Sequence, residues 1–256
     1  DCLLSRGLGD VYKRQVSIYS GENRTIDFSY LNPVSTHLEI ELNERDNHYG
    51  GTGGQNAIWQ ISMDYMPLKK LRLSSNILID ELALDNLSSD TLTSKNDYAV
   101  KTRLSYSFSL DRYFITAYTN YTYVSEYTFR HENGSNNFVS RSLPLGTDLG
   151  SDGYSIFFGI KMVLPWKYVA DFNFGLKRNG ENNLIHNLYD SNIINDLNNN
   201  KFSKKNKFAS IDIKYVLTKN TNLRFGLKAF NYSAEDKIQY HYYCLVNSSL
   251  STIIKF

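Results

Sequence analysis

The residues that could do chemistry in this chain show no spacing typical of a catalytic or metal centre. The five histidines form no metal-ligand spacing and no i, i+4 pair with a glutamate; they are His37, His48, His131, His186 and His241. The glycine run at 50–54 lacks the Lys-Ser/Thr ending of a phosphate loop. A Ser-His-Asn hydrolase stays open as an alternative, although no local sequence singles out a nucleophile. We therefore expect no enzyme activity, no cofactor and no metal.

The dominant pattern is an alternation of side chains with a period of two. From Tyr98 to Leu110 every second residue is apolar, aromatic or Thr, and the residues between them are Ala, Lys, Arg and Ser. This period places the two sets on opposite faces of a β-strand. The same alternation returns in 168–177, 207–217 and 223–229.

Twelve candidate strands follow from this pattern: 16–20, 25–31, 36–43, 57–66, 70–82, 98–109, 113–128, 154–164, 168–179, 207–218, 223–233 and 238–250. Their connections alternate between short and long. The short ones lie near Pro33, Pro67, Asp111, Trp166 and Asn220. The long ones lie near Gly51, Ser89, Gly134 and Asn198, and the connection at 234–237 breaks the rhythm because it is short.

These features predict an all-β fold, an antiparallel up-and-down transmembrane β-barrel of a bacterial outer membrane. Such barrels have tight periplasmic turns and long extracellular loops. The charged set must then face the lumen; it includes Lys101, Arg103, Asp171, Lys177, Asp212, Lys214, Arg224 and Lys228. The alternatives are a soluble β-sandwich and a β-solenoid. The formal net charge of +2 gives no argument for a nucleic-acid partner.

The first fifteen residues are treated apart from the rest. The segment Ser5–Gln15, SRGLGDVYKRQ, resembles the in-frame translation of a transposase-type sequencing adaptor. We therefore exclude residues 1–15 from the fold prediction as non-native. Residues 16–256 are expected to form the C-terminal portion of one barrel domain, as an incomplete fragment.

Several segments resemble the capsule assembly Wzi family of outer-membrane barrels. They are IDFSYLNP at 26–33, QNAIWQISMDYMP at 55–67, LRLSSNILIDEL at 71–82, AYTNYTYVSEYTF at 117–129, LPLGTDLG at 143–150 and KRNGEN at 177–182. The resemblance implies a barrel of about 18 strands, about 12 of them supplied here. It also implies a surface lectin that holds capsular or extracellular polysaccharide at the cell. The partners are then outer-membrane lipid, that polysaccharide and the barrel-assembly machinery.

Aromatic and basic residues in the expected outer loops are candidates for glycan binding, because sugar rings stack on aromatic side chains. They are Tyr127, Phe129, Arg130, His131, Phe138, Arg141 and Tyr189. The alternative is that these residues pack the loops and the membrane interface. A second functional hypothesis is a porin or solute channel, since the lumen face carries many charges.

Overall fold

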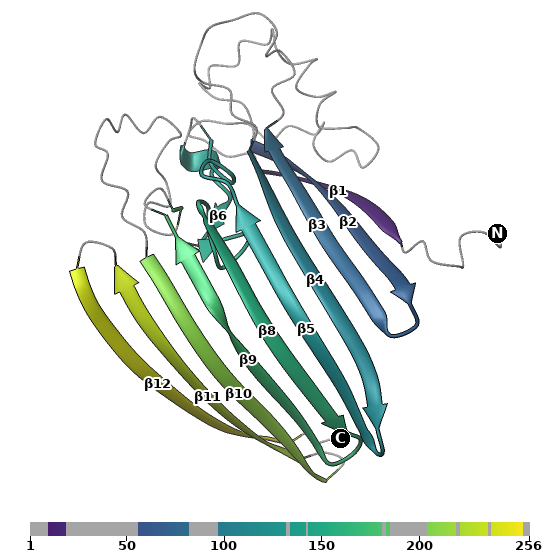
Figure 1. Ribbon diagram of the computed structural model, residues 1–256. Coiled ribbons are helices and arrows are strands. Elements are labelled where there is room, and N and C mark those ends of the chain that lie inside the picture. Colours follow the sequence, from purple (N-terminus) through teal and green to yellow (C-terminus); the bar gives the residue numbers. More distant parts are fainter. Residues whose placement is uncertain are drawn as a thin grey trace, which may run out of the picture.

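The computed structural model describes residues 10–18, 56–81, 97–131, 134–141, 143–180, 183–184, 204–218, 221–234 and 237–252. Within these ranges the chain forms one antiparallel, up-and-down sheet of ten strands in the order β1-β2-β3-β4-β5-β8-β9-β10-β11-β12 (Figure 1). A short hairpin and one turn of 3-10 helix lie between β5 and β8. The predicted all-β, antiparallel up-and-down class is therefore confirmed.

The long strands are β1 (Val11–Ile18), β2 (Asn56–Leu68), β3 (Leu71–Glu81), β4 (Asp97–Leu110), β5 (Tyr113–Val124), β8 (Gly153–Leu164), β9 (Tyr168–Asn179), β10 (Lys204–Thr218), β11 (Thr221–Ala234) and β12 (Lys237–Thr252). Each of the nine predictions from 57–66 onward coincides with one of the long strands β2–β5 and β8–β12. The prediction at 16–20 falls on β1, which begins inside the segment interpreted as adaptor. The predictions at 25–31 and 36–43 lie outside the described residues.

One boundary prediction is wrong. The strand expected at 113–128 ends at Val124, because the chain leaves the sheet at Ser125 and turns inward. A 3-10 turn, η2 (Gly134–Asn136), and a hairpin of β6 (Val139–Ser140) and β7 (Leu143–Pro144) follow before β8. The expected long loop at 129–153 therefore contains ordered structure of its own.

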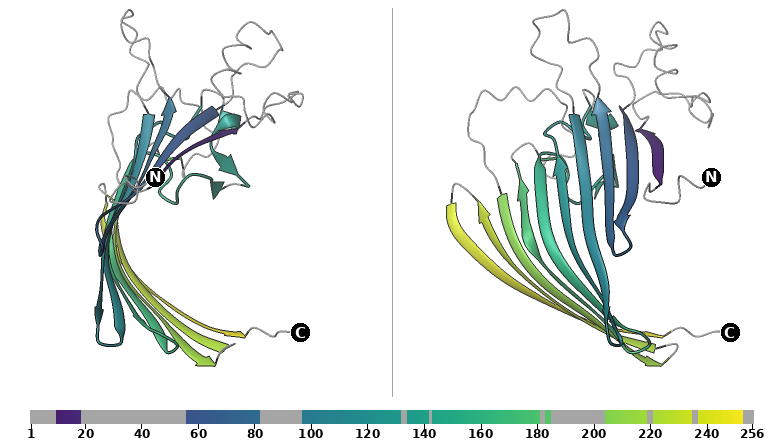
Figure 2. Two further views of the ribbon diagram at one scale, coloured as in Figure 1. Left: turned by 90° about the vertical axis from the view of Figure 1, so that its right-hand side faces the viewer. Right: turned by 45° about the vertical axis from the view of Figure 1, so that its right-hand side comes forward.

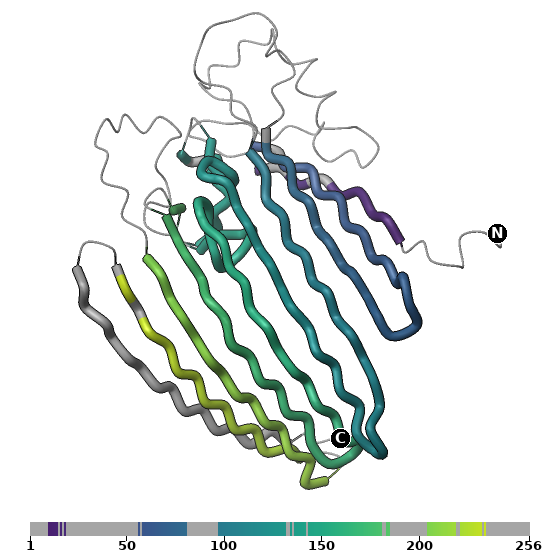
Figure 3. The backbone as a smooth tube through the Cα atoms, viewed as in Figure 1, coloured from purple at the N-terminus to yellow at the C-terminus, as the bar shows by residue number. Residues whose placement is uncertain are grey.

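The sheet is strongly curved, with one concave and one convex face (Figure 2). In the backbone trace of Figure 3, the strands of the sheet run side by side. The edges are β1 and β12, which are not paired with each other, so the described sheet is open. Tight turns join β2 to β3, β4 to β5 and β8 to β9 at one end, here called the turn end. Residues 125–152 lie at the opposite end, here called the loop end.

The cross-strand register keeps the two sets of side chains on separate faces. Lys101 pairs with Asn76 and Thr122, and Leu104 pairs with Leu73 and Thr119. Since opposite residues project from the same face, the polar set gathers on the concave side and the apolar set on the convex side. The alternation seen in the sequence is thus continuous across β2 to β11.

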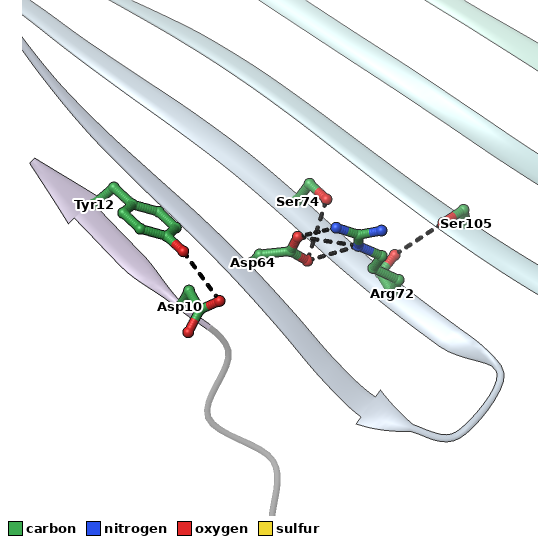
Figure 4. A network of polar contacts seen from close by, with 6 residues as sticks. All are labelled: Asp10, Tyr12, Asp64, Arg72, Ser74 and Ser105. Carbon is green, nitrogen blue, oxygen red and sulfur yellow. Dashed lines mark hydrogen bonds and ion pairs between the residues drawn. The ribbon is translucent and has the colours of Figure 1, made fainter. Parts of the chain in front are cut away.

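Pairs of polar side chains link neighbouring strands on the concave face. The Arg72 guanidinium forms an ion pair with Asp64, whose carboxylate also accepts a hydrogen bond from Ser74 at 3.4 Å (Figure 4). Arg224 Nη2 lies 2.9 Å from Asp212 Oδ2 in the same way, between β11 and β10. These exposed pairs contribute little each, but they offset part of the like-charge repulsion on this face, where Asp212 lies opposite Asp171 and Lys214 opposite Arg224.

A third concave-face contact depends on a glycine. The Tyr118 hydroxyl donates to Asp171 Oδ1 at 2.7 Å, and the Arg103 guanidinium lies 4.1 Å from the centre of the Tyr118 ring. Tyr118 crosses above Gly159 of β8 to reach Asp171 of β9. A Cβ at Gly159 would clash with the Tyr118 ring and with Asn173 Oδ1. Gly159 therefore permits the close approach of the ring to the backbone.

We predict that Gly159→Ala destabilises the protein by about 1–3 kcal/mol, because the added methyl group displaces Tyr118. Denaturant unfolding measures the change. In a Tyr118→Ala background the same substitution should cost clearly less, since the ring is gone. An equal cost in both backgrounds would contradict the packing described.

Candidate ligand-binding site

Residues 125–131, 134–141 and 143–152, here called the inner segment, fold onto the concave side of the sheet at the loop end. Figure 2 shows η2, β6 and β7 on that side of the strands. The segment thus covers part of the polar face instead of extending away from the sheet. Its position depends on a small core, on hydrogen bonds to strand ends and on contacts with the concave wall.

Apolar side chains hold the inner segment against the strands. Ile58 of β2, Ala99 of β4 and Val124 of β5 form a buried cluster with Phe129, Phe138, Leu149 and Leu184. The Phe129 and Phe138 rings lie 5.9 Å apart between centroids, at 53°. Both rings are only 2% exposed. Burying two aromatic rings gives the segment several kcal/mol of apolar stabilisation by area.

Hydrogen bonds fix the beginning of the segment to β4. Ser125 Oγ donates to Asp97 Oδ1 at 2.7 Å and accepts from the Tyr98 amide at 3.1 Å. Thr128 Oγ1 donates to the Tyr98 carbonyl at 3.1 Å. The next residue, Phe129, has a positive φ of 74°, and its amide donates to the Asp80 carboxylate of β3. A bulky residue in this backbone region is strained, so these contacts and the buried ring must hold it there.

Two asparagines fix the end of the segment. Asn183 Nδ2 donates to the Leu149 carbonyl at 2.8 Å and also to the Ser151 carbonyl. Asn179 Nδ2 donates to the same Leu149 carbonyl at 3.0 Å. The Leu184 amide donates to Ser151 Oγ at 2.8 Å. The inner segment is therefore anchored at both ends by buried polar contacts, which are costly to break.

A cavity of about 470 Å³ lies between the inner segment and the concave wall. The strands contribute Ser74, Asn76, Lys101, Arg103, Asn120, Thr122, Ser155, Phe157, Lys177 and Phe208 to its lining. The inner segment contributes Thr147, Asp148 and Leu149. Lys177 Nζ donates to the Asp148 carbonyl at 2.6 Å and so ties the segment to β9. The volume is within the range of about 300–1,000 Å³ common for small-molecule sites.

The aromatic wall of the cavity is built over a glycine. Phe157 of β8 and Phe208 of β10 are both cross-strand partners of Gly175 on β9. Because Gly175 has no side chain, the two rings can meet above it, with centroids 6.0 Å apart. A Cβ at Gly175 would clash with Phe157. The result is an aromatic surface on an otherwise polar face.

One buried polar group at the cavity lacks a partner. Asn120 is only 5% exposed, and its Nδ2 has no hydrogen-bond partner among the described residues. An amide N–H left unsatisfied in a buried place costs about 1–3 kcal/mol. Since Asn120 lines the cavity, a bound ligand with an acceptor oxygen would satisfy it.

The structure separates the candidate residues chosen from the sequence. Phe129, Arg130 and Phe138 are buried in the inner segment, with 2%, 4% and 2% exposure, so they do not form an exposed glycan-stacking surface. They pack the segment instead, as the alternative interpretation had it, because their partners lie on distant strands.

The other candidates lie at the periphery. Arg141 is exposed, and Tyr127 and His131 are partly buried. Burial, followed by the carboxylates of Glu126 and Asp97, raises the pKa of the Tyr127 hydroxyl above its ordinary value. Tyr189 lies outside the described residues. The sequence analysis placed Lys101, Arg103 and Lys177 on the lumen face, and the structure brings them to one cavity, but it missed Asn120, Phe157 and Phe208.

Comparisons with known proteins add no identification. No family model matches the chain, and neither a curated protein nor a solved structure matches it. Among the described residues, no helix is long and apolar enough to cross a membrane. The described part of the chain also contains no group of three or more His, Cys, Asp or Glu residues that could hold a metal ion.

We predict that Asn183→Ala loosens the inner segment while leaving the sheet intact. The Leu149 and Ser151 carbonyls each lose a donor, which costs about 1–3 kcal/mol of local stability. Limited chymotrypsin digestion should then cleave after Phe129 or Phe138, which are protected in the wild type. Arg141→Ala is the matched control, since that exposed side chain leaves the core untouched. Unchanged protection in Asn183→Ala would contradict the anchoring role.

Proposed function

We propose that this chain is part of an outer-membrane β-barrel that binds capsular or extracellular polysaccharide at the cell surface. The observation that supports the membrane placement is the convex face, which is apolar and open to the surroundings. Its exposed side chains include Ile61, Leu104, Tyr106, Phe158, Ile160, Phe172, Phe174, Ile213 and Phe225. Exposed apolar side chains spread over neighbouring strands of one face are typical of a surface that contacts another protein or a membrane.

On β4, β5, β8 and β9, charges border the convex face but do not enter its middle. On the strands nearer the two edges, Lys13 of β1 lies opposite Ile61 and Lys207 of β10 lies opposite Leu176 on this face. By register, Arg178 and Lys205 are opposite one another on this face, near the loop end. Lys69, Lys70, Arg112 and Lys167 are exposed at the turn end. Between these borders, the outward positions of β4, β5, β8 and β9 hold apolar, aromatic or Thr residues. This distribution fits an apolar band between two headgroup regions.

Aromatic residues mark the turn-end border of the band. Trp166 is 88% exposed in the turn between β8 and β9. The Tyr113 and Tyr168 rings meet beside this turn, with centroids 6.2 Å apart. Amphipathic rings concentrate at both interfaces of a bilayer. This group of rings therefore lies where the proposal places the membrane–water interface. In this proposal the turn end is periplasmic, the loop end faces outward, and further strands close the barrel.

The cavity supports the binding part of the proposal. It combines an aromatic surface from Phe157 and Phe208 with hydroxyl, amide and ammonium groups. Sugar rings pack their apolar faces on aromatic rings and use polar groups to fix their hydroxyls. The resemblance of several segments to the capsule assembly Wzi family agrees with this assignment. The cavity lies at the loop end, where a polymer outside the cell would reach it.

A solute channel is the second candidate function, because the concave face is charged and a lumen of many strands can conduct ions. The inner segment argues against wide conduction, since it covers part of that face and is anchored at both ends. The two functions differ in a measurable way. A binder should conduct little and retain polysaccharide, whereas a channel should conduct in the absence of any glycan.

We predict that Leu104→Lys destabilises the membrane-inserted protein by about 2–4 kcal/mol, because it puts a charge on the lipid face. Leu104 is 41% exposed on the convex side. Ser107→Lys is the control, since Ser107 is on the concave face of the same strand and should cost less than about 1 kcal/mol. Guanidinium unfolding from lipid vesicles measures both. Similar costs for the two variants would contradict lipid contact at Leu104.

We also expect the protein in a planar bilayer to show little conductance and to bind its host's exopolysaccharide in a pull-down. Asn183→Ala, which loosens the inner segment, should raise the conductance and weaken glycan retention together. Large, stable channels in the wild type without glycan binding would favour the solute channel instead.

A further inference from the structure

The charge of the cavity lining is unbalanced. Three cations line it, Lys101 and Arg103 from β4 and Lys177 from β9, against one carboxylate, that of Asp148. A fourth cation borders the site, because Lys228 Nζ lies 5.8 Å from the centre of the Phe208 ring. Asp171 of β9, which does not line the cavity, adds a second negative charge near it and accepts hydrogen bonds from Tyr118 and Asn173, so four cations stand against two carboxylates. The site therefore carries an excess of positive charge.

These cations keep donors available toward the cavity. Lys177 uses one N–H on the Asp148 carbonyl, and an ammonium group has three. The Arg103 guanidinium lies over the Tyr118 ring at 4.1 Å, and a stacked guanidinium keeps its N–H edges free for an acceptor in its own plane. Asn120 adds an amide N–H that lacks a partner in the described structure. Cationic donors therefore face a cavity whose lining contains a single carboxylate, which favours an anionic ligand.

We propose that the cavity binds an acidic sugar, with the carboxylate of a hexuronate residue placed among Lys101, Arg103 and Lys177 and an acceptor oxygen at Asn120. The inference rests on the proposed function and names its ligand class. A volume of about 470 Å³ and the Phe157–Phe208 surface exceed what a small inorganic anion would use. Both features suit a pyranose ring, whose apolar face packs on the aromatic side chains.

Calorimetric titration of the detergent-solubilised protein with defined probes tests this. The probes are trigalacturonate, its carboxyl-reduced neutral counterpart and inorganic sulfate. The wild type should bind trigalacturonate at least roughly tenfold more tightly than the neutral trisaccharide, since ionised acceptors form the stronger hydrogen bonds. Added salt should reduce this preference.

Lys101→Gln should weaken trigalacturonate binding about fivefold or more and leave the neutral probe unchanged. Lys214→Gln is the matched control, because Lys214 is exposed on β10 and does not line the cavity. Asn120→Asp, which adds a negative charge and removes the amide donor, should reduce binding of the acidic probe more than that of the neutral probe. Unfolding in denaturant checks that each variant is folded. Because Lys101 is exposed, Lys101→Gln should fold and still tests the inference if Asn120→Asp does not fold.

Three outcomes would overturn the inference, and they are distinguishable. Equal binding of both trisaccharides, with no effect of Lys101→Gln, would support saccharide binding but contradict the preference for an acidic ligand. Lys101-dependent binding of sulfate without trigalacturonate binding would assign a free-anion site. Binding of none of the probes, and of no host polysaccharide, would remove the proposed function itself.

Discussion

Backbone pairing between adjacent antiparallel strands from β2 to β11, in a register that shifts only near strand ends, is the constraint on which the rest of this structure depends. It fixes every second side chain to one face, so a single-residue slip would exchange the two faces. Tyr168–Asn179 illustrates the consequence: Phe172 and Phe174 point to the convex side, while Asp171 and Asn173 meet Tyr118 on the concave side. Glycines at 159 and 175 let large concave side chains cross or meet without breaking the ladder.

The inner segment packs against the loop end of this sheet. Its buried rings contact Ile58, Ala99 and Val124, which take concave positions at the ends of β2, β4 and β5. At this end, each of these three strands has one apolar residue on the concave face, which is largely polar. The segment forms one side of a half-open cavity over the charged part of the same face, with Lys177 joining wall and segment. Binding groups from distant strands are thus brought together by one loop, a common arrangement for functional sites.

The sequence predicted the strands well because a period-two pattern is a local signal. It placed Lys101, Arg103 and Lys177 on one face for the same reason. The burial of Phe129, Arg130 and Phe138 was not predictable in this way, because it also depends on residues about 30 or more positions away in the chain. These include Ile58, Ala99 and Leu184 of the same cluster and Asp80, whose carboxylate accepts from the Phe129 amide. A signal for the aromatic wall was present: Phe157 and Phe208 occupy positions where the alternation calls for a polar residue. Residues that break a local pattern in this way often belong to a functional site.

Spin-label accessibility along β9 tests the central claim, that the convex face contacts lipid, most directly. Labels at successive positions from Ala170 to Leu176, in protein reconstituted into vesicles, are exposed to oxygen, which concentrates in lipid, and to a polar nickel complex, which stays in water. The account predicts oxygen maxima at 170, 172, 174 and 176, with nickel maxima at the positions between. Equal nickel accessibility at both sets of positions would contradict it.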